Sequence, residues 1–463
     1  MRKHKKILVA LLAVAALVAM IVPVGTASAG SWSVEQITHA NIPDARLDHV
    51  FVLPSDTDNV WIVGERNDDT NVPVILRSTD GGTTWTNATT PATMDQDIDG
   101  LYFASATEGW FSAGAGYIYH TTDGGANWTL QTSDTDQALY AIEFLADGDT
   151  GVAVGFNGAV TNTTDGGATW TAETLTSTGG SQMLFGVELA SNDVWYAVGK
   201  AGNFFKSTNG GDTWTNNPGV GLGEEIAAEF FFDCAAPSAT EAYIGTQSGI
   251  IVKTADGTTW TSIASSVTGA SSVYAIDAIG AGKVWACGGA GKLIYTEDGG
   301  TTWNTKTTGM ASNLRHLDFV AGEVGYVVGD GGAVFKVTFT PALPTAAFSA
   351  DVVTAVVDTD VTFTDASTGG VTAWAWDFGD DSGTSTVQDP VYAYDTAGTY
   401  TVTLTVTNED GDDELVKTDY ITITGAGCCA SAAATAADIG SSAALVGMLG
   451  LMATYFHFRK RRS

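Results

Sequence analysis

The sequence is poor in basic residues: it has 20 Lys and Arg against 52 Asp and Glu, and its formal net charge is −32. Eight of the 20 lie at the two ends, in residues 2–6 and 459–462, which leaves twelve for the rest of the chain. A chain with this balance repels phosphate backbones, so nucleic acid is not an expected partner. The surplus of carboxylates attracts divalent cations, and it is equally typical of a protein from a salty habitat.

Cysteine is also rare, and four Cys in 463 residues exclude a disulfide scaffold. No CxxC or Cys/His grouping occurs, so no zinc site is predicted. Cys234 and Cys287 fall in strand-like segments, where we expect two buried thiols; a bridge between them is the alternative. The signatures GxSxG, HExxH and the P-loop are absent as well. We therefore predict no catalytic residue and no certain cofactor.

Both ends of the chain carry membrane-related signals. Residues 1–29 combine a basic start, an apolar run and the small residues Ala27-Ser28-Ala29, which indicates a cleaved signal peptide; a retained anchor is the alternative. Ile439–Phe458 is apolar and long enough to span a bilayer, and the basic tail 459–463 is expected to stay in the cytoplasm. These signals predict a secreted, cell-surface protein anchored by a C-terminal transmembrane helix, with its bulk outside the cell.

The C-terminal segment has a second interpretation. A Cys/Ala-rich linker, residues 425–438, precedes the apolar stretch and contains Cys428 and Cys429. This order resembles the C-terminal sorting signals of prokaryotic surface proteins, in which the tail is removed and a Cys is modified. The permanent helix and the sorting segment both remain open because they need the same apolar length.

One short motif recurs along the first two thirds of the chain, as in "TTDGGATW" at Thr163–Trp170. Its Asp or Asn recurs every 42 to 47 residues, with strand-like segments between the copies. A period of this size is typical of a β-propeller with one four-stranded blade per repeat. A seventh repeat begins at Asn313 but lacks the motif, and Ser31–Thr38 resembles the missing outer strand, with Trp32 in place of the motif Trp. We therefore predict an all-β fold whose residues 30–340 form a seven-bladed β-propeller closed by its N-terminal strand.

The motif matches the Asp box, S/T-x-D-x-G-x-T-W, of bacterial-neuraminidase (BNR) repeats. The Asp is placed to accept backbone N–H bonds in its own turn, the glycines permit positive φ, and the Trp offers an apolar face to bury between blades. The resemblance places these turns on the outer rim, so we assign them a structural role. The copies with Asn209 and with the shortened turn at Asp256 are expected to be looser. The structural residues are Asp80, Trp85, Asp123, Trp128, Asp165, Trp170, Asn209, Trp214, Asp256, Trp260, Asp298 and Trp303.

A "GWxxG"-type strand precedes each box, and the whole repeat resembles the propeller of the photosystem II stability/assembly factor family of plants and cyanobacteria. The resemblance covers residues 31–340 and implies the fold. It also implies basic patches that meet a partner, whereas this propeller is strongly acidic. The photosystem role is therefore not carried over.

A linker, residues 341–344, leads to a second domain at residues 345–424. "AWAWDFGDDSGTS" and the alternating strand "TYTVTLTVT" resemble a PKD domain, a small Ig-like β-sandwich, except that Asp381 replaces the last Gly of the WDFGDG pattern. The resemblance implies a spacer or a binding module. Asp377 and Asp380 are expected to form turns rather than to bind ligands.

Two acidic features remain as candidate metal sites. Five carboxylates occupy one place in the first strands of consecutive repeats, where they would surround the central channel and favour a cation, Ca²⁺ or a cationic group of a ligand. These five are Glu143, Glu188, Glu229, Asp277 and Asp318. "DQDIDG" has the spacing of a calcium loop, with Asp95, Asp97 and Asp99 as ligands, but it lacks the bidentate Glu of an EF-hand. The alternative is a hydrated wall and an ordinary turn, without a metal.

These patterns predict a non-enzymatic cell-surface binding, adhesion or scaffold protein whose propeller recognises a glycan or a surface protein. The second hypothesis is a secreted glycan-active hydrolase with a sialidase-like or xyloglucanase-like propeller, although the propeller has only four Arg residues for a sialidase trio. The third is an assembly factor for an envelope complex, by the family resemblance. An exposed aromatic patch on the funnel face would favour binding, and a carboxylate pair in an open cleft would favour the hydrolase.

Overall fold

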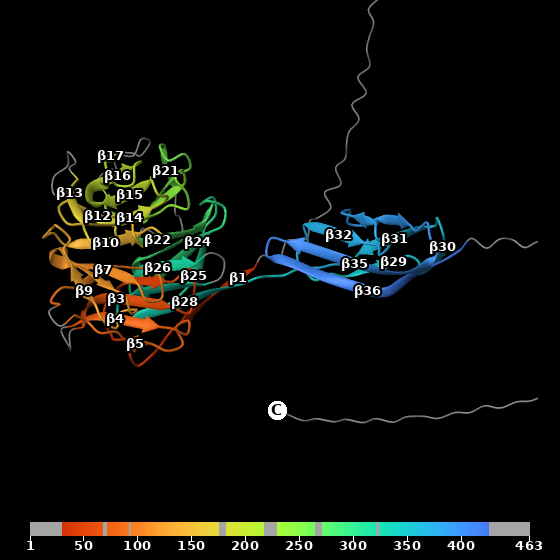
Figure 1. The fold of residues 1–463 in the computed structure, drawn as a ribbon, viewed down its shortest axis with the longest axis horizontal. Coiled ribbons are helices and arrows are strands. Elements are labelled where there is room, and N and C mark those ends of the chain that lie inside the picture. Colours follow the sequence, from red (N-terminus) through yellow and green to blue (C-terminus); the bar gives the residue numbers. More distant parts are fainter. Residues whose placement is uncertain are drawn as a thin grey trace, which may run out of the picture. The chain divides into compact units, whose positions relative to one another are not determined.

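The computed structural model describes residues 30–67, 72–91, 94–175, 182–216, 229–263, 271–320 and 324–425. The described residues are strands joined by turns, with three single-turn 3₁₀ segments, so the all-β prediction is confirmed (Figure 1). They divide into two compact units: the first contains the residues up to Pro344 with the short segments Gly369–Thr372 and Thr407–Asp412, and the second contains the other residues from Thr345 onward. The signal peptide, Cys428, Cys429, the apolar stretch and the basic tail lie outside the described residues. Within the described part, no helix is long and apolar enough to cross a membrane.

The described residues of the first unit form seven four-stranded antiparallel sheets, one for each predicted repeat. The first three sheets contain β2 (Leu47–Val52), β3 (Val60–Asn67), β4 (Val72–Ser78) and β5 (Thr86–Asn87); β6 (Ile98–Phe103), β7 (Gly109–Ala113), β8 (Ile118–Thr121) and β9 (Thr129–Gln131); and β10 (Leu139–Phe144), β11 (Gly151–Gly155), β12 (Ala159–Thr163) and β13 (Thr171–Thr174). The next two contain β14 (Leu184–Leu189), β15 (Trp195–Gly199), β16 (Phe204–Ser207) and β17 (Trp214–Asn216); and β18 (Phe231–Ala235), β19 (Ala242–Thr246), β20 (Ile251–Thr254) and β21 (Trp260–Ile263).

The sixth sheet contains β22 (Val273–Gly280), β23 (Lys283–Gly288), β24 (Lys292–Thr296) and β25 (Asn304–Thr307). The last contains β26 (Leu314–Val320), β27 (Val324–Gly329) and β28 (Ala333–Thr340) together with β1 (Ser31–Gln36) from the other end of the propeller. The 3₁₀ segments η1 (Gly114–Gly116), η2 (Lys200–Gly202) and η3 (Gly289–Gly291) join the second and third strands of three sheets.

The N-terminal strand completes the last sheet. β1 pairs antiparallel with β28, and Trp32 lies opposite Phe339. The predicted pairing of the N-terminal strand with the last repeat is therefore confirmed, and the start of the chain supplies the fourth strand of that sheet. Trp32 is buried beside Trp285 of the sixth sheet, with ring centroids 5.0 Å apart in an edge-to-face arrangement.

Each Asp box forms the turn between the outer two strands of its sheet. In the third sheet, Asp165 Oδ1 accepts the Thr169 N–H at 2.8 Å and the Thr163 hydroxyl at 2.9 Å. Gly166 and Gly167 adopt φ angles of 66° and 82°, which disfavour any residue with a side chain. Asn209 makes the same two contacts, at 3.0 Å each, so we find no looser hydrogen bonding at this departure from the motif.

The shortened box at Asp256 also keeps its side-chain bonds, because its Oδ1 accepts the N–H groups of Thr258 and Thr259 at 2.8 and 2.6 Å. The expectation of looser turns therefore finds no support in the hydrogen bonds of either copy. The carboxyl of Asp256 is held as an anion by these donors, which lower its pKa.

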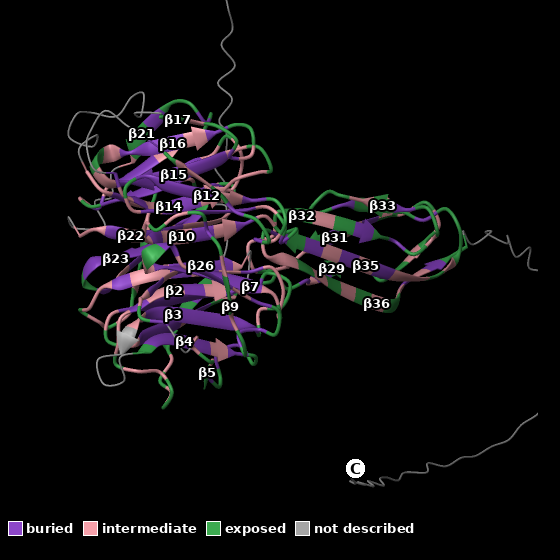
Figure 2. Cartoon of the chain, turned by 60° about the vertical axis from the view of Figure 1, so that its left-hand side comes forward, coloured by how far each residue is buried: buried purple, intermediate pink, exposed green. Residues whose placement is uncertain are grey.

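The motif tryptophans lie between neighbouring sheets. Trp260 packs against Tyr196 of the preceding sheet at 6.1 Å between ring centroids, and Trp170 shares a core with Trp110 of the sheet before it. Burial follows the strands of each sheet (Figure 2), with the centre of every repeat inaccessible to solvent. Each indole therefore adds apolar area to the contact between one blade and the next.

Basic side chains also join neighbouring sheets, which the sequence did not reveal. Four of them lie on third strands, reach over a second-strand aromatic ring and donate to a glycine carbonyl in the Asp box of the following sheet. The pairs are Arg77 with Gly124, Lys206 with Gly257, Lys253 with Gly299 and Lys336 with Gly81. We call these four residues the inter-blade clasps. A third of the twelve internal basic residues is thus used for packing rather than for a basic surface.

The second unit is a sandwich of two sheets. One contains β29 (Phe348–Ala350), β31 (Asp360–Asp365) and β34 (Val391–Ala393). The other contains β30 (Thr354–Val356), β36 (Gly411–Thr424), β35 (Gly398–Asn408), β32 (Ala373–Asp377) and β33 (Thr384–Ser385). Alternate residues of β35 are buried, as the period-2 pattern predicts. Asp377 and Asp380 accept turn N–H groups from Gly379 and Gly383 at 2.8 and 2.6 Å, so both form turns.

Candidate binding cavity

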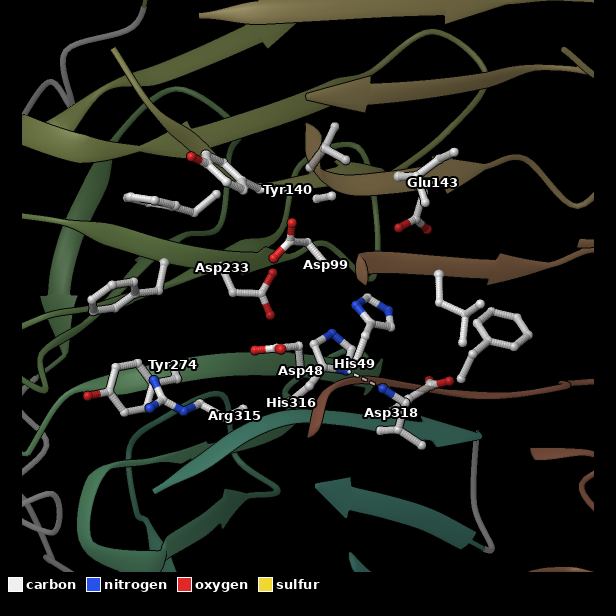
Figure 3. Close-up of a pocket in the computed structure, with 18 of the residues that line it drawn as sticks. Asp48, His49, Asp99, Tyr140, Glu143, Asp233, Tyr274, Arg315, His316 and Asp318 are labelled. Atoms are coloured by element: carbon white, nitrogen blue, oxygen red, sulfur yellow. Dashed lines mark hydrogen bonds between the residues drawn. The ribbon is translucent and has the colours of Figure 1, made fainter. Parts of the chain in front are cut away.

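The first strands of all seven propeller sheets surround a cavity of about 690 Å³. Cys234 is buried and contributes to the cavity lining, and Cys287 is buried in the sixth sheet. Both cysteines are free thiols, so the predicted alternative of a disulfide bridge between them is wrong. Two basic and nine acidic side chains contribute to the lining. Figure 3 shows its charged residues projecting inward from different strands.

A β-bulge recurs in every first strand and determines which side chains face the cavity. In each strand the pairing with the second strand slips between the first and third residues, as between Leu139 and Ala141 of β10. The same slip occurs in β2, β6, β14, β18, β22 and β26. The extra residue at the second position is left out of the ladder and turns toward the lumen.

We call these second-position residues the bulge row. In order around the ring they are Asp48, Asp99, Tyr140, Phe185, Phe232, Tyr274 and Arg315, and all seven line the cavity. The fifth-position residues form a second row, which we call the inner row. It consists of Phe51, Tyr102, Glu143, Glu188, Ala235, Asp277 and Asp318.

Four of the five predicted channel carboxylates share the inner row, namely Glu143, Glu188, Asp277 and Asp318. The fifth, Glu229, was wrongly placed. It precedes β18, where its carbonyl accepts the Gly202 N–H and its carboxyl accepts the Ser248 N–H at 3.0 Å. The strand β18 begins at Phe231, two residues after Glu229. The three successive Phe residues 230–232 show no apolar–polar alternation, so the sequence did not reveal where the strand begins. Ala235 fills the inner row, and Asp233 brings a carboxyl into the cavity from the third position.

We call the four inner-row carboxyls together with that of Asp233 the inner carboxyls, and three of them link the first strands of neighbouring sheets. Asp318 Oδ2 accepts the Val52 N–H at 2.6 Å, and Asp277 Oδ2 accepts the Phe319 N–H at 2.7 Å, each from the next sheet around the ring. Asp233 accepts the Ile276 N–H at 3.0 Å in the same way. These carboxyls therefore satisfy backbone donors between blades, besides facing the lumen.

Burial and mutual repulsion raise the pKa values of the inner carboxyls. Burial raises the pKa of Asp233 to about 7, and desolvation together with Asp318, Asp233 and Asp277 raises that of Glu143. Two histidines, His49 and His316, stack beside them with ring centroids 3.6 Å apart. Burial lowers the pKa of His316 to about 4, and its Nδ1 accepts the Val50 N–H. At neutral pH the cavity therefore holds neutral imidazoles and partly protonated carboxyls.

One side of the cavity mouth is acidic. Asp48 pairs with Arg46 at 2.6 Å, and Arg46 also pairs with Glu65. The Asp48 side chain is only 8% exposed, and its second oxygen, Oδ2, is buried without a hydrogen-bond donor among the described residues. Asp99 occupies the equivalent position in the next sheet, where burial and then the charge of Asp48 raise its pKa to about 8.

The predicted calcium loop does not form. Asp99 lies in β6 and Gly100 pairs with Ser112 in the sheet, because the alternating segment Ile98–Phe103 continues as a strand. Asp97 lines the cavity with Asp99, whereas Asp95 does not. Among the residues that the structure describes, no three His, Cys, Asp or Glu side chains are grouped as metal ligands. Calcium binding, at these residues or at the inner row, stays a prediction.

The other side of the mouth is aromatic. Tyr140 and Phe185 lie 5.9 Å apart between ring centroids, Phe185 and Phe232 lie 5.9 Å apart, and Phe232 and Tyr274 lie 5.1 Å apart. All four are half-buried and line the cavity, and we call them the aromatic arc. Arg315 ends the arc: its guanidinium lies 5.0 Å from the Tyr274 ring and makes two bonds to Asp330, of 2.7 and 3.1 Å.

Comparison with known families agrees with the resemblances found in the sequence. Residues 127–278 and 272–338 match the family described as photosynthesis system II assembly factor YCF48, and residues 341–423 match the PKD domain. Sequence similarity to individual relatives is local. The chain is 39% identical over 57 residues to the photosystem II assembly lipoprotein Ycf48 of Synechocystis sp. and 36% identical over 56 residues to the chloroplastic stability/assembly factor HCF136 of Oryza sativa subsp. japonica. Each match covers 12% of this chain and only 16% or 14% of the relative.

Solved structures share the propeller fold. YCF48 from Cyanidioschyzon merolae aligns with a TM-score of 0.53 at 21% identity, over 66% of this chain and 98% of its own. A YCF48 bound to D1 peptide aligns with a TM-score of 0.52 at 20% identity, over 66% and 96%. The WD40 propeller of Doa1 reaches the same TM-score at 10% identity, over 67% and 97%. The three likenesses establish a propeller, and they do not by themselves transfer a ligand.

Proposed function

We propose that this protein is a non-enzymatic binding or scaffold protein whose propeller receives a segment of a partner polypeptide in its central cavity. The aromatic arc at the cavity mouth carries the proposal. Half-buried aromatic rings in a concave site supply apolar contact area at little cost in side-chain entropy, and such rings dominate the energetics of recognition sites. The cavity volume of about 690 Å³ suits a few side chains of a partner.

A polypeptide is favoured over a glycan by the composition of the mouth. Its aromatic side is continuous and apolar, with Phe185 and Phe232 at the centre, and its charged side begins directly at Tyr140. A peptide offers apolar and charged side chains at alternating positions, which matches such a divided wall. The neighbour described as YCF48 bound to D1 peptide supports the same class of partner.

The remaining parts fit a role at the cell surface. In this proposal the seven sheets are the seven blades of one closed propeller, the PKD domain is a spacer or a second binding module, and the C-terminal segment attaches the protein to the membrane. The partner is then a protein of the envelope, and an assembly role for an envelope complex is the form of scaffold function that the matched family supports. The hydrolase hypothesis has less support, because Asp233, Asp277 and Asp318 already accept backbone bonds between blades.

The test is selection from a displayed random-peptide library on the purified full chain, with a glycan array in parallel. We expect peptides whose binding is lost in Phe232→Ala and in Tyr274→Ala. The matched control is Leu130→Ala, which shortens an exposed apolar side chain on β9 of the second sheet. Peptides that bind all variants equally, or a glycan that binds while no peptide does, would contradict the proposal. Release of sugar from the glycans would establish the hydrolase.

A further inference from the structure

The bulge row divides into an acidic part and an aromatic part that follow one another around the ring. Asp48 and Asp99 are neighbours, Tyr140 follows Asp99, and Arg315 precedes Asp48. Both basic groups near the acidic part are already engaged, since Arg46 pairs with Asp48 and Glu65, and Arg315 pairs with Asp330. The cavity lining thus keeps an excess of carboxyls with no further basic side chain beside them.

We infer that Asp48 and Asp99 form a receptor for one guanidinium or ammonium side chain of the partner peptide, with the aromatic arc receiving the apolar residues next to it. The inference rests on the proposed function and names the chemistry of its ligand. Figure 3 shows the Asp48 and Asp99 carboxyl groups inside the ring, with Asp99 toward Tyr140 and Asp48 toward Arg315.

Asp48 supplies the observation that points to a ligand. Its Oδ1 is used by Arg46, but its buried Oδ2 receives no donor from the described part of the chain. Such an oxygen costs free energy unless something donates to it. Asp48 lines the cavity, so the lumen is the side from which a ligand approaches its carboxyl.

Asp99 supplies the second half of the receptor. It occupies the bulge position equivalent to Asp48 in the next sheet, and the charge of Asp48 disfavours its ionisation. A cation placed beside the two carboxyls displaces the proton that Asp99 holds and gains from both charges. Tyr140 follows Asp99 in the bulge row and lines the same cavity, so its ring offers a face for a cation–π contact.

An organic cation fits these residues better than a metal ion. No metal-ligand group of three occurs among the residues described, and two carboxyls on adjacent strands are a match for the planar fork of a guanidinium. The chain itself uses the same combination elsewhere, since Arg315 lies over Tyr274 while it binds the Asp330 carboxyl. Arg is therefore the preferred ligand side chain, ahead of Lys.

The experiment compares two tripeptides on the purified full chain, acetyl-Phe-Arg-Phe-amide and the isosteric citrulline peptide, by calorimetry or by competition. Citrulline keeps the shape and removes the charge. We expect the Arg peptide to bind about tenfold more tightly, and Asp99→Asn to abolish this difference. The matched control is Glu35→Gln, which removes one exposed carboxylate from the outer strand β1 and should preserve the tenfold preference.

Several outcomes would overturn the inference. Equal binding of the two peptides, binding of neither, or a preference that survives Asp99→Asn would each remove the receptor. Competition of Ca²⁺ alone with the Arg peptide would replace it by a metal site. The comparison of the Arg and citrulline peptides on the unsubstituted protein tests the receptor even if the Asp99→Asn variant is unstable. The proposed function is judged separately, because library peptides that need Phe232 but show no enrichment in Arg or Lys would sustain it and refute the receptor.

Discussion

Lys336 Nζ donates a hydrogen bond of 2.8 Å to the carbonyl oxygen of Gly81, and so joins the last repeat of the propeller to the Asp box of the first. The two residues are 255 positions apart in the sequence. The ammonium group also lies over the Tyr326 ring at 5.8 Å. One basic side chain thus stabilises the point at which the ring closes.

Replacement of this clasp should weaken the closed ring. Lys336→Met keeps the length of the side chain but removes the donor, so the buried Gly81 carbonyl loses its partner. We expect a loss of about 1–2 kcal/mol in the free energy of unfolding, measured by denaturant titration. The control is Lys283→Met, at an exposed position in the sixth sheet. An equal effect of the two substitutions would contradict a specific role for the clasp.

The Asp box offers a prediction in which two substitutions should differ. Asp165→Ala removes the acceptor for the Thr169 N–H and for two hydroxyl groups, so the turn loses its side-chain bonds. Asp165→Asn should be nearly neutral, because Asn209 makes the same contacts in the fourth sheet. We expect the alanine variant to lower the melting temperature of the propeller by roughly 2–4 °C and the asparagine variant to leave it within a degree. Equal melting temperatures for the two would show that the carboxyl bonds do not hold the turn.

The repeat made much of the propeller predictable. A motif that recurs in six of the seven sheets gives the period of the repeat, and the lone N-terminal segment with Trp32 could be recognised by its likeness to the outer strands. The carboxylates of the inner row could also be predicted from the sequence, since Glu143 and Glu188 each lie between apolar residues in comparable strands. Local alternation and repetition carry this information because they do not depend on contacts between repeats.

The bulge row could not be predicted in the same way. A strict alternation places second-position residues such as Tyr140 and Phe232 on the face opposite the third position, whereas the bulge turns both toward the lumen. The available signal was the recurring order apolar, variable, small or polar, apolar, variable, as in "LYAIE" and "LRHLD". The clasps gave no signal at all, because the acceptor of Lys253 is a backbone carbonyl 46 residues later.

The cavity carboxyls predict how stability depends on pH. Asp99, Glu143 and Asp233 have folded-state pKa values raised to about 8, 8 and 7, so the folded chain holds protons that the unfolded chain releases near pH 4. Their contribution is complete below about pH 4 and is lost as the pH rises to 8. His49 and His316, whose pKa values are lowered, act in the opposite direction below about pH 6.5.

The two effects oppose one another in mild acid, so the decline should be clearest between pH 6.5 and 8.5. We expect the melting temperature of the propeller to fall across this range, and Glu143→Gln to reduce the fall because one titrating group is gone. Calorimetric scans at constant ionic strength measure both, and the PKD transition serves as the internal reference. A melting temperature that rises above pH 6.5 would contradict the assigned pKa directions.

The same protons should compete with the cationic ligand. Binding of acetyl-Phe-Arg-Phe-amide requires Asp48 and Asp99 to be ionised, and burial raises their pKa values to about 6 and 8. The other charged or titratable groups that face Asp99 are Arg46 and Glu65 of the first sheet, Asp97 beside it and Tyr140 of the third sheet. Since the guanidinium keeps its charge throughout, the affinity should rise by more than about tenfold from pH 5.5 to pH 8.5, with protons released on binding. The citrulline peptide should show no such rise, and calorimetry in two buffers of different ionisation enthalpy counts the protons. An affinity that is constant with pH, or that falls, would mean that the cation does not displace protons from these two carboxyls.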